Sequence, residues 1–233
     1  MRIIALASGS SGNAYVISNG QTKLLLDAGI PIRKLQKKCE FNLIGIDGCL
    51  VTHCHKDHSA AAQALTRYGI DIYTSSGTIQ ACDLSGQHIK PVKAKQSFSV
   101  GSFVILPFEV QHDAPEPLGF LIASPTTEEK LLYFTDTYYL KYNFNGLTHI
   151  MGECNYSIPL VRKSVQNGQI PEALAKRLIK SHMSLEHFKE YLQATDLSKV
   201  RQIYLLHLSE NNSNSSLFKQ EIQKLTGKEV YVC

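Results

Sequence analysis

The sequence has no run of about 18 consecutive apolar residues, the length that a transmembrane helix needs. Its opening, MRIIALASGSSGN, has too short an apolar segment for a secretory signal peptide and is more typical of a strand followed by a turn. The six cysteines are scattered without CxxC spacing, a usage typical of reduced thiols. We therefore expect a cytoplasmic protein that contacts no membrane.

Internal repeats, low-complexity linkers and visible domain boundaries are also missing. A chain of 233 residues, 43% of them apolar, is long enough to bury one sizeable core. The net charge of +4 permits a polyanionic substrate without demonstrating one. We predict one domain over residues 1–233 and leave its oligomeric state open.

The densest group of chemically active side chains lies in the segment VTHCHKDHSAA, after an apolar run. Alternate side chains of an extended segment share one face, so His53, His55 and Asp57 can converge, and His58 joins them where the chain turns. Imidazole and carboxylate together suit zinc, manganese or iron better than calcium or magnesium. Four such residues within six positions favour a metal site over an ordinary polar loop.

The segment SAAAQALTRYG follows directly, and we predict a helix that Ser59 caps and Gly69 ends. Strands and helices alternate along the rest of the chain, which by itself indicates an α/β fold. Three later predicted strands, over residues 102–107, 130–134 and 202–206, are each followed by a further ligand-type residue: His112, Asp136 and His207.

Two features near the N-terminus allow more than one interpretation. The loop SGSSGN, from Ser8 to Asn13, is either a loop beside the site or a tight hairpin turn. It is not a Walker P-loop, because no Gly-Lys-Ser/Thr follows. Asp27, at the end of a predicted strand, either orients a metal ligand or caps the following turn.

The HxHxDH pattern with a spaced His, Asp and His resembles that of the metallo-β-lactamase superfamily of binuclear metal hydrolases. The motifs SGSSGN, LLLDAG, THCHKDH, HDAPEPLGF, TDTYY, ECNYS, SHMS and YLLHLSENN are similar to those of its WalJ/YycJ-like branch of DNA exonucleases. The branch commonly has glycine where this chain has Tyr138. The resemblance implies an α/β four-layer αβ/βα sandwich in a single domain, without a β-CASP insertion.

The resemblance also implies a ligand set for two divalent metal ions, zinc or manganese. One ion would take His53, His55 and His112. The other would take Asp57, His58 and His207, with Asp136 bridging the two. A metal-bridging hydroxide would then hydrolyse phosphodiester bonds in nucleic acid, with Asp57 counted among the catalytic residues as well. DNA as the polymer follows from the resemblance alone.

His182 is the candidate proton donor to the departing oxygen, and Glu153, after a predicted strand, is the candidate to orient it. The alternative for His182 is a loop histidine that caps or packs. Ser184 begins a predicted helix whose free N–H groups suit a phosphate, so we expect a substrate contact there. We also expect substrate contacts at Ser8 and Asn13, the two ends of the SGSSGN loop, if that loop lies beside the site.

Two other functions remain open from the sequence. One is hydrolysis of a small phosphodiester or a thioester, which activity on model esters without polymer digestion would reveal. The other is a nucleic-acid-binding protein with a vestigial metal site, which metal-independent binding would reveal.

Overall fold

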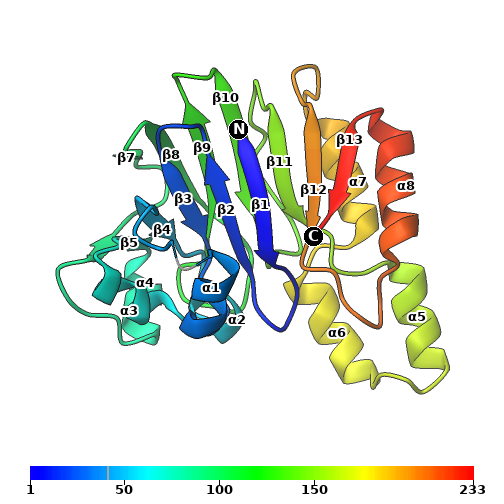
Figure 1. Ribbon diagram of the computed structural model, residues 1–233. Coiled ribbons are helices and arrows are strands. Elements are labelled where there is room, and N and C mark those ends of the chain that lie inside the picture. The colour runs from blue at the N-terminus through cyan, green and yellow to red at the C-terminus, as the bar shows by residue number, and fades with distance from the viewer. Residues whose placement is uncertain (41) are drawn as a thin grey trace. The chain divides into compact units, whose positions relative to one another are not determined.

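The computed structural model describes residues 1–40 and 42–233, and the chain divides into two compact units. The first unit comprises Met1–Glu109 and Ala114–Glu129. The second comprises Val110–Asp113 and Lys130–Cys233. Figure 1 labels their helices and strands.

A six-stranded sheet, in the order β1-β2-β3-β4-β5-β6, forms the centre of the first unit. The first three strands pair antiparallel and the last four pair parallel. Three further strands of this unit, in the order β7-β8-β9, pair antiparallel. The bounds are β1 (Arg2–Ala7), β2 (Ala14–Ser18), β3 (Lys23–Leu26), β4 (Gly48–Leu50), β5 (Ile72–Thr74), β6 (Ile89–Pro91), β7 (Phe98–Val100), β8 (Phe103–Glu109) and β9 (Leu118–Ser124).

The helices of the first unit are short. Leu35 of α1 and Leu65 of α3 pack with Leu25, Val51 and Ile72 of the sheet in one apolar core. Because β3 and β4 are buried on both faces, they have near-continuous apolar sequences rather than alternating ones. The helices are α1 (Ile32–Lys38), α2 (Lys56–Ser59), α3 (Ala62–Leu65), a 3₁₀ turn (Thr66–Tyr68) and α4 (Ser76–Ala81).

The helix predicted after Ser59 begins earlier and is interrupted. It starts at Lys56, and the Ser59 hydroxyl donates to the carbonyls of Cys54 and His55 instead of capping a later start. The carbonyl of Asp57, which a continuous helix would use internally, accepts a bond from the backbone N–H of Asn13 (2.7 Å). Tertiary hydrogen bonds therefore compete with the helix at this position.

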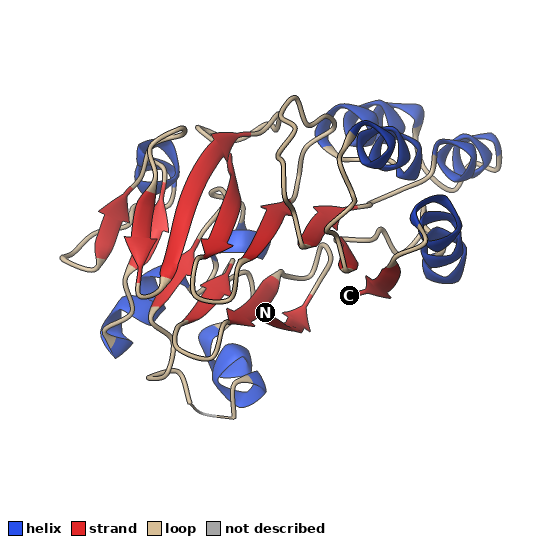
Figure 2. Cartoon of the chain, turned by 90° about the horizontal axis from the view of Figure 1, so that it is seen from above, coloured by secondary structure: helices blue, strands red, loops and turns tan. Residues whose placement is uncertain are grey.

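The second unit is built on four parallel strands in the order β10-β11-β12-β13. Its helix α8 packs against β13 and α7 (Figure 1, Figure 2). The elements are β10 (Glu129–Phe134), β11 (His149–Glu153), α5 (Ile158–Gln166), α6 (Glu172–Ser181), α7 (Leu185–Ala194), β12 (Gln202–Leu206), α8 (Ser215–Thr226) and β13 (Glu229–Val232).

Close packing of α7 on the strands depends on Gly152. A Cβ atom there would lie 2.5 Å from the ring of Phe134 and 2.7 Å from the ring of Phe188, so no larger residue fits without movement. Helix α5 was not predicted. Its first turn is held from outside, because the Glu186 carboxylate accepts from Ser157 Oγ (3.0 Å) and from the Ile158 N–H (3.1 Å).

Candidate metal centre

The first-unit cluster consists of His53, His55, Asp57 and His58, which lie just beyond the carboxyl end of β4. The Nε2 atom of His53 lies 3.1 Å from Nδ1 of His55, and the His53 and His58 ring centroids lie 4.3 Å apart. The Asp57 carboxylate lies 3.4 Å from His58 Nε2. Three imidazoles and one carboxylate thus converge within this unit.

Asp27 positions this cluster through hydrogen bonds to His58 and Thr52. Fully buried at the end of β3, it accepts from His58 Nδ1 (2.8 Å) and from the Thr52 N–H (2.8 Å). Thr52 Oγ1 donates to Asp27 and also lies 3.0 Å from His53 Nδ1. Because Nδ1 of His58 is bound to the carboxylate, its Nε2 is the ring atom that faces the cluster, as in carboxylate–histidine–metal arrangements.

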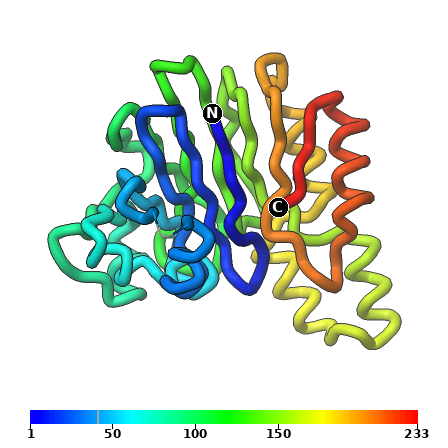
Figure 3. The backbone as a smooth tube through the Cα atoms, viewed as in Figure 1, coloured from blue at the N-terminus to red at the C-terminus, as the bar shows by residue number. Residues whose placement is uncertain are grey.

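The backbone at Asp57 packs very closely against the backbone at Gly29. A Cβ atom on Gly29 would lie 1.6 Å from the Asp57 carbonyl oxygen, so this approach requires glycine. The fully buried Asn13 side chain donates to the same carbonyl (3.2 Å) and lies 3.1 Å from His58 Nε2. Figure 3 traces the dark-blue loop between β1 and β2 that carries it. The SGSSGN loop therefore lies beside the first-unit cluster.

The second-unit cluster consists of His112, Asp136, Glu153, His182 and His207. Strand register brings three of these residues together, since Glu153 pairs with Leu206, and Phe134 pairs with Gly152 on the other side of β11. Asp136, Glu153 and His207 therefore stand at adjacent carboxyl ends of parallel strands, where sites of α/β proteins form.

The ligand atoms of this cluster are close enough to share a cation. Those of Asp136, Glu153, His182 and His207 all lie within 4.8 Å of one another, and His112 Nε2 lies 3.5 Å from Asp136 Oδ2. Imidazole nitrogens with carboxylate oxygens are a donor set suited to zinc or manganese. The donor chemistry of both clusters thus fits the expected divalent metals.

Three residues at strand ends adopt the left-handed backbone conformation. Two of them, Asp136 (φ 46°) and His207 (φ 53°), belong to the second-unit cluster, and the third, Asp27 (φ 57°), bonds to the first-unit cluster. This conformation costs a non-glycine residue about 1–2 kcal/mol. Strain of this kind concentrates at functional sites, where the surrounding structure holds it.

Glu153 is the buried centre of the second-unit cluster. It is fully buried, and its Oε1 accepts from His182 Nδ1 (2.6 Å). Its Oε2 accepts from the N–H groups of Thr137 and Met183, each at 3.0 Å. Burial raises the pKa of the Glu153 carboxyl, but the charge of His182 and the hydrogen bonds from His182 and His207 outweigh it. That pKa lies below its usual value, so the group is ionised.

His182 differs from the other members in exposure. Its side chain is 19% exposed, compared with 2% for His112 and 3% for His207. Burial lowers the pKa of the His182 imidazole, but the charge and hydrogen bond of Glu153 and the charge of Asp136 outweigh it, so the pKa lies above its usual value. Its solvent access and its raised pKa both suit His182 to the transfer of a proton.

Sequence reasoning missed Asn155. The Asn155 amide donates to the carbonyl of His207 (2.7 Å), and its Nδ2 lies 2.9 Å from His207 Nδ1. These contacts hold both the ring and the left-handed backbone of His207. The signal in the sequence was the ECNYS motif, which places an amide two residues after Glu153.

The expected substrate residues Ser184 and Ser8 are engaged in local structure, as Asn13 is. The fully buried Ser184 hydroxyl accepts from the N–H of His187 (3.1 Å) and caps α7. Ser8 Oγ accepts from Tyr15 Oη (2.8 Å). Direct contact of these residues with a substrate stays a prediction.

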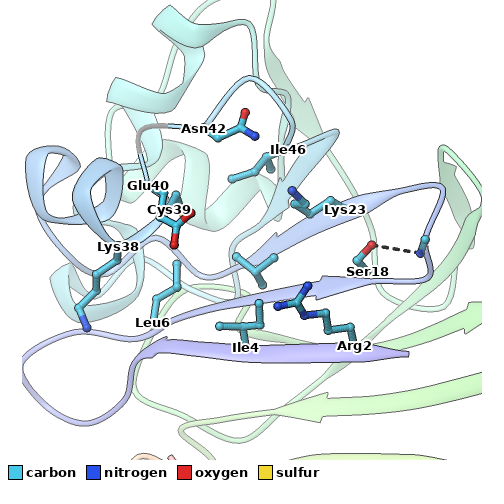
Figure 4. Close-up of a pocket in the computed structure, with 12 residues that line it drawn as sticks. Arg2, Ile4, Leu6, Ser18, Lys23, Lys38, Cys39, Glu40, Asn42 and Ile46 are labelled. Carbon is cyan, nitrogen blue, oxygen red and sulfur yellow. Dashed lines mark hydrogen bonds between the residues drawn. The ribbon is translucent and has the colours of Figure 1, made fainter.

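A cavity of about 600 Å³ lies elsewhere in the first unit, beside β1, β2 and α1 (Figure 4). Its lining includes the apolar residues Ile4, Leu6 and Val16 and the cations Arg2 and Lys38. No member of the first-unit cluster is among the described residues that line it.

Within residues 1–40 and 42–233, no helix combines the length and the apolar character that crossing a membrane requires.

Comparison with known families and proteins gives consistent matches. The family described as "Beta-lactamase superfamily domain" matches residues 22–208. The chain is 30% identical to an exodeoxyribonuclease YycJ of Bacillus anthracis, covering 94% of this chain and 87% of that protein. It is also 30% identical to an exodeoxyribonuclease WalJ of Streptococcus pneumoniae serotype 2 (strain D39), covering 91% of this chain and 83% of that protein.

Among solved structures, the metallo-β-lactamase fold protein YhfI from Bacillus subtilis matches with a TM-score of 0.75 at 17% identity. The match covers 99% of this chain and 95% of that one. The predicted fold class is thereby confirmed as a mixed α/β metallo-β-lactamase fold with two sheets and helices.

Proposed function

Because the chain belongs to the β-lactamase superfamily domain family, we propose that it is a metal-dependent hydrolase of phosphodiester bonds in nucleic acid, acting as a DNA exonuclease. The observation that carries the proposal is the His182–Glu153 pair at 2.6 Å, inside a cluster of metal-ligand residues. The relatives named exodeoxyribonuclease support hydrolysis and point to DNA.

The metal ligands proposed are those of the two clusters taken together. One divalent ion, zinc or manganese, would be held by His53, His55 and His112. A second would be held by Asp57, His58 and His207, and Asp136 would be shared. When bound, such ions lower the pKa of a coordinated water and neutralise charge on the phosphate.

His182 supplies the proton that the departing oxygen needs. Since a carboxylate only accepts hydrogen bonds, the Nδ1–H of His182 points at Glu153, and Nε2 is the nitrogen left to donate to the substrate. Glu153 holds the ring in this orientation and stabilises its charged form, as a carboxylate supports a catalytic histidine elsewhere. Its two backbone bonds fix its own position.

A basic surface near His182 suits a polyanion. The helical pair α5 and α6, which leads directly into His182, carries exposed cations and a single acidic residue, Glu172. The exposed cations are Arg162, Lys163, Lys176, Arg177 and Lys180. Positive charge of this kind supports binding to a nucleic-acid backbone.

The experiment that tests this function compares end-labelled double-stranded DNA, single-stranded DNA and RNA of matched length, with added manganese or zinc. The inactive control is Asp136→Asn. Asparagine tolerates the left-handed backbone of Asp136 and keeps its shape while losing the charge. Stepwise shortening of DNA by the native protein, absent in the control, is the expected result.

Other outcomes separate the rival functions. Cleavage of a small chromogenic phosphodiester with all three polymers intact would replace the nuclease with a small-molecule hydrolase. DNA binding of unchanged affinity after metal removal, with no hydrolysis, would replace it with a binding protein.

A further inference from the structure

A cavity of about 220 Å³ lies in the second unit, and two of its lining residues, Tyr139 and Met183, follow Asp136 and His182 closely in the sequence. One wall is formed by residues of the segment 139–143, and the other is formed by Met183 together with one face of α7. Six of its lining residues carry the argument: Tyr139, Lys141, Met183, His187, Glu190 and Tyr191.

The α7 wall follows from helical spacing. His187, Glu190, Tyr191 and Ala194 stand at positions i, i+3, i+4 and i+7, so they share a face. Leu185, Phe188 and Leu192 of α7 are buried and do not line the cavity. The face that lines the cavity is therefore a mixed polar and aromatic surface.

The side chains of the cavity suit a flat, hydrogen-bonding ring. Tyr139 is 57% exposed, so its ring is available for stacking. His187 lines the same cavity and offers an imidazole ring that can form a hydrogen bond to a ligand. Lys141 and Glu190 add a cation and a carboxylate. Aromatic stacking with a few polar contacts is how proteins bind single nucleobases.

Both walls are tied to the carboxylate that orients His182. Glu153 Oε2 accepts from the N–H of Thr137, whose Oγ1 donates to the carbonyl of Tyr139 (2.8 Å). The same oxygen accepts from the N–H of Met183, at the other wall. A ring bound in the cavity would therefore have a defined position relative to the His182 imidazole.

We propose that this cavity binds the base of the terminal nucleotide of a nucleic-acid strand, stacked on Tyr139 and hydrogen-bonded to His187. The proposal rests on the function proposed above and deepens it. A cavity below the range of about 300–1,000 Å³ of typical ligand sites holds one base rather than two. An end nucleotide leaves its stack at a lower cost than an internal one, so the cavity selects strand ends.

The test uses metal-loaded protein and oligonucleotides that carry the fluorescent base 2-aminopurine at either the 5′ or the 3′ end, with uncleavable phosphorothioate linkages beside it. Stacking on Tyr139 quenches this fluorescence, which yields an affinity. Tyr139→Ala and His187→Leu are the test variants, and Tyr139→Phe keeps the ring. Tyr138→Ala is the matched control, because Tyr138 is also exposed yet does not line the cavity.

We expect quenching with one of the two labelled ends. Tyr139→Ala weakens that binding about 5- to 150-fold, while Tyr139→Phe and Tyr138→Ala bind nearly as the native protein does. We also expect native protein to hydrolyse a strand with an abasic terminal nucleotide more slowly than an ordinary strand, and Tyr139→Ala to lose this preference.

Equal effects of Tyr138→Ala and Tyr139→Ala, or no quenching at either end, would overturn the cavity proposal even if DNA is digested. Failure to hydrolyse any nucleic acid would instead overturn the proposed function, since quenching is measured without cleavage.

Discussion

The four side chains of the first-unit cluster come from six consecutive residues, whereas those of the second-unit cluster come from five separate segments between His112 and His207. The first cluster is placed by one loop that Asp27, Asn13 and Gly29 hold. The second is assembled by the register of parallel strands. A local cluster depends on backbone turns, and a dispersed one depends on the whole unit being folded.

The two clusters also differ in the solvent exposure of the histidine that bonds to a buried carboxylate. Beside the first-unit cluster, the buried carboxylate of Asp27 bonds to a histidine that is fully buried, His58. In the second-unit cluster the buried carboxylate, Glu153, bonds to a histidine that reaches solvent, His182. The first pairing suits the holding of a ligand, and the second suits the delivery of a proton.

The largest effect is expected from removing one carboxylate ligand from either cluster. Asp57→Asn and Asp136→Asn should each abolish hydrolysis and lower the metal content, because each removes a negative donor that a divalent ion needs. Elemental analysis of the purified proteins, beside the hydrolysis assay, checks this. If one variant stays fully active, its cluster does not hold an essential metal.

His182→Ala should reduce kcat about 100- to 10,000-fold while the metal content is unchanged, because it removes a proton donor rather than a ligand. Single-turnover hydrolysis and elemental analysis measure the two effects separately. A metal-depleted His182→Ala protein would make His182 a ligand and would remove the distinction between the two buried carboxylate–histidine pairs.

Asp27→Asn should weaken metal binding about 10- to 100-fold, because the amide no longer fixes the orientation of His58. Competition with a chelator measures the affinity. Asp71→Asn is the matched control, since Asp71 also bonds to a histidine, His88, at 2.7 Å but outside the cluster. Similar losses in both variants would reflect general destabilisation rather than ligand orientation.

The smallest effect is expected in the pH profile of Glu153→Gln. The Glu153 charge raises the pKa of His182, and a proton donor loses activity as the pH rises through its pKa. The alkaline limb of kcat should therefore move to lower pH in the variant, which rates measured across the alkaline range would show. An unmoved limb, at unchanged metal content, would assign that limb to another group.

Much of the first-unit cluster could be predicted because its ligands are close together in the sequence. The role of Asp27 stayed open between orienting a ligand and capping a turn, and its bond to His58 favours the first. The helix predicted from Ser59 was wrong in its start and continuity. The competing bond from Asn13 to the Asp57 carbonyl comes from a loop that is distant in the sequence.

In the second unit, the strands and the residues that follow them could be predicted from apolar segments and their ends. Asn155 and α5 were missed, because their partners, His207 and Glu186, lie far away along the chain. Propensity and spacing describe neighbours in sequence, and these contacts exist only once the strands have paired.

The sequence by itself determined the alternation of strands and helices, the HxHxDH group and the ligand-type residues at later strand ends. Apolar periodicity and short-range spacing involve residues that are close together in the sequence, so they can be recognised without the structure. Only the tertiary structure decided that Glu153 joins His182 to both walls of the small cavity, and that Asp136 and His207 adopt the left-handed backbone. Strand register and buried hydrogen bonds, which act between distant segments, supply the free energy that holds them there.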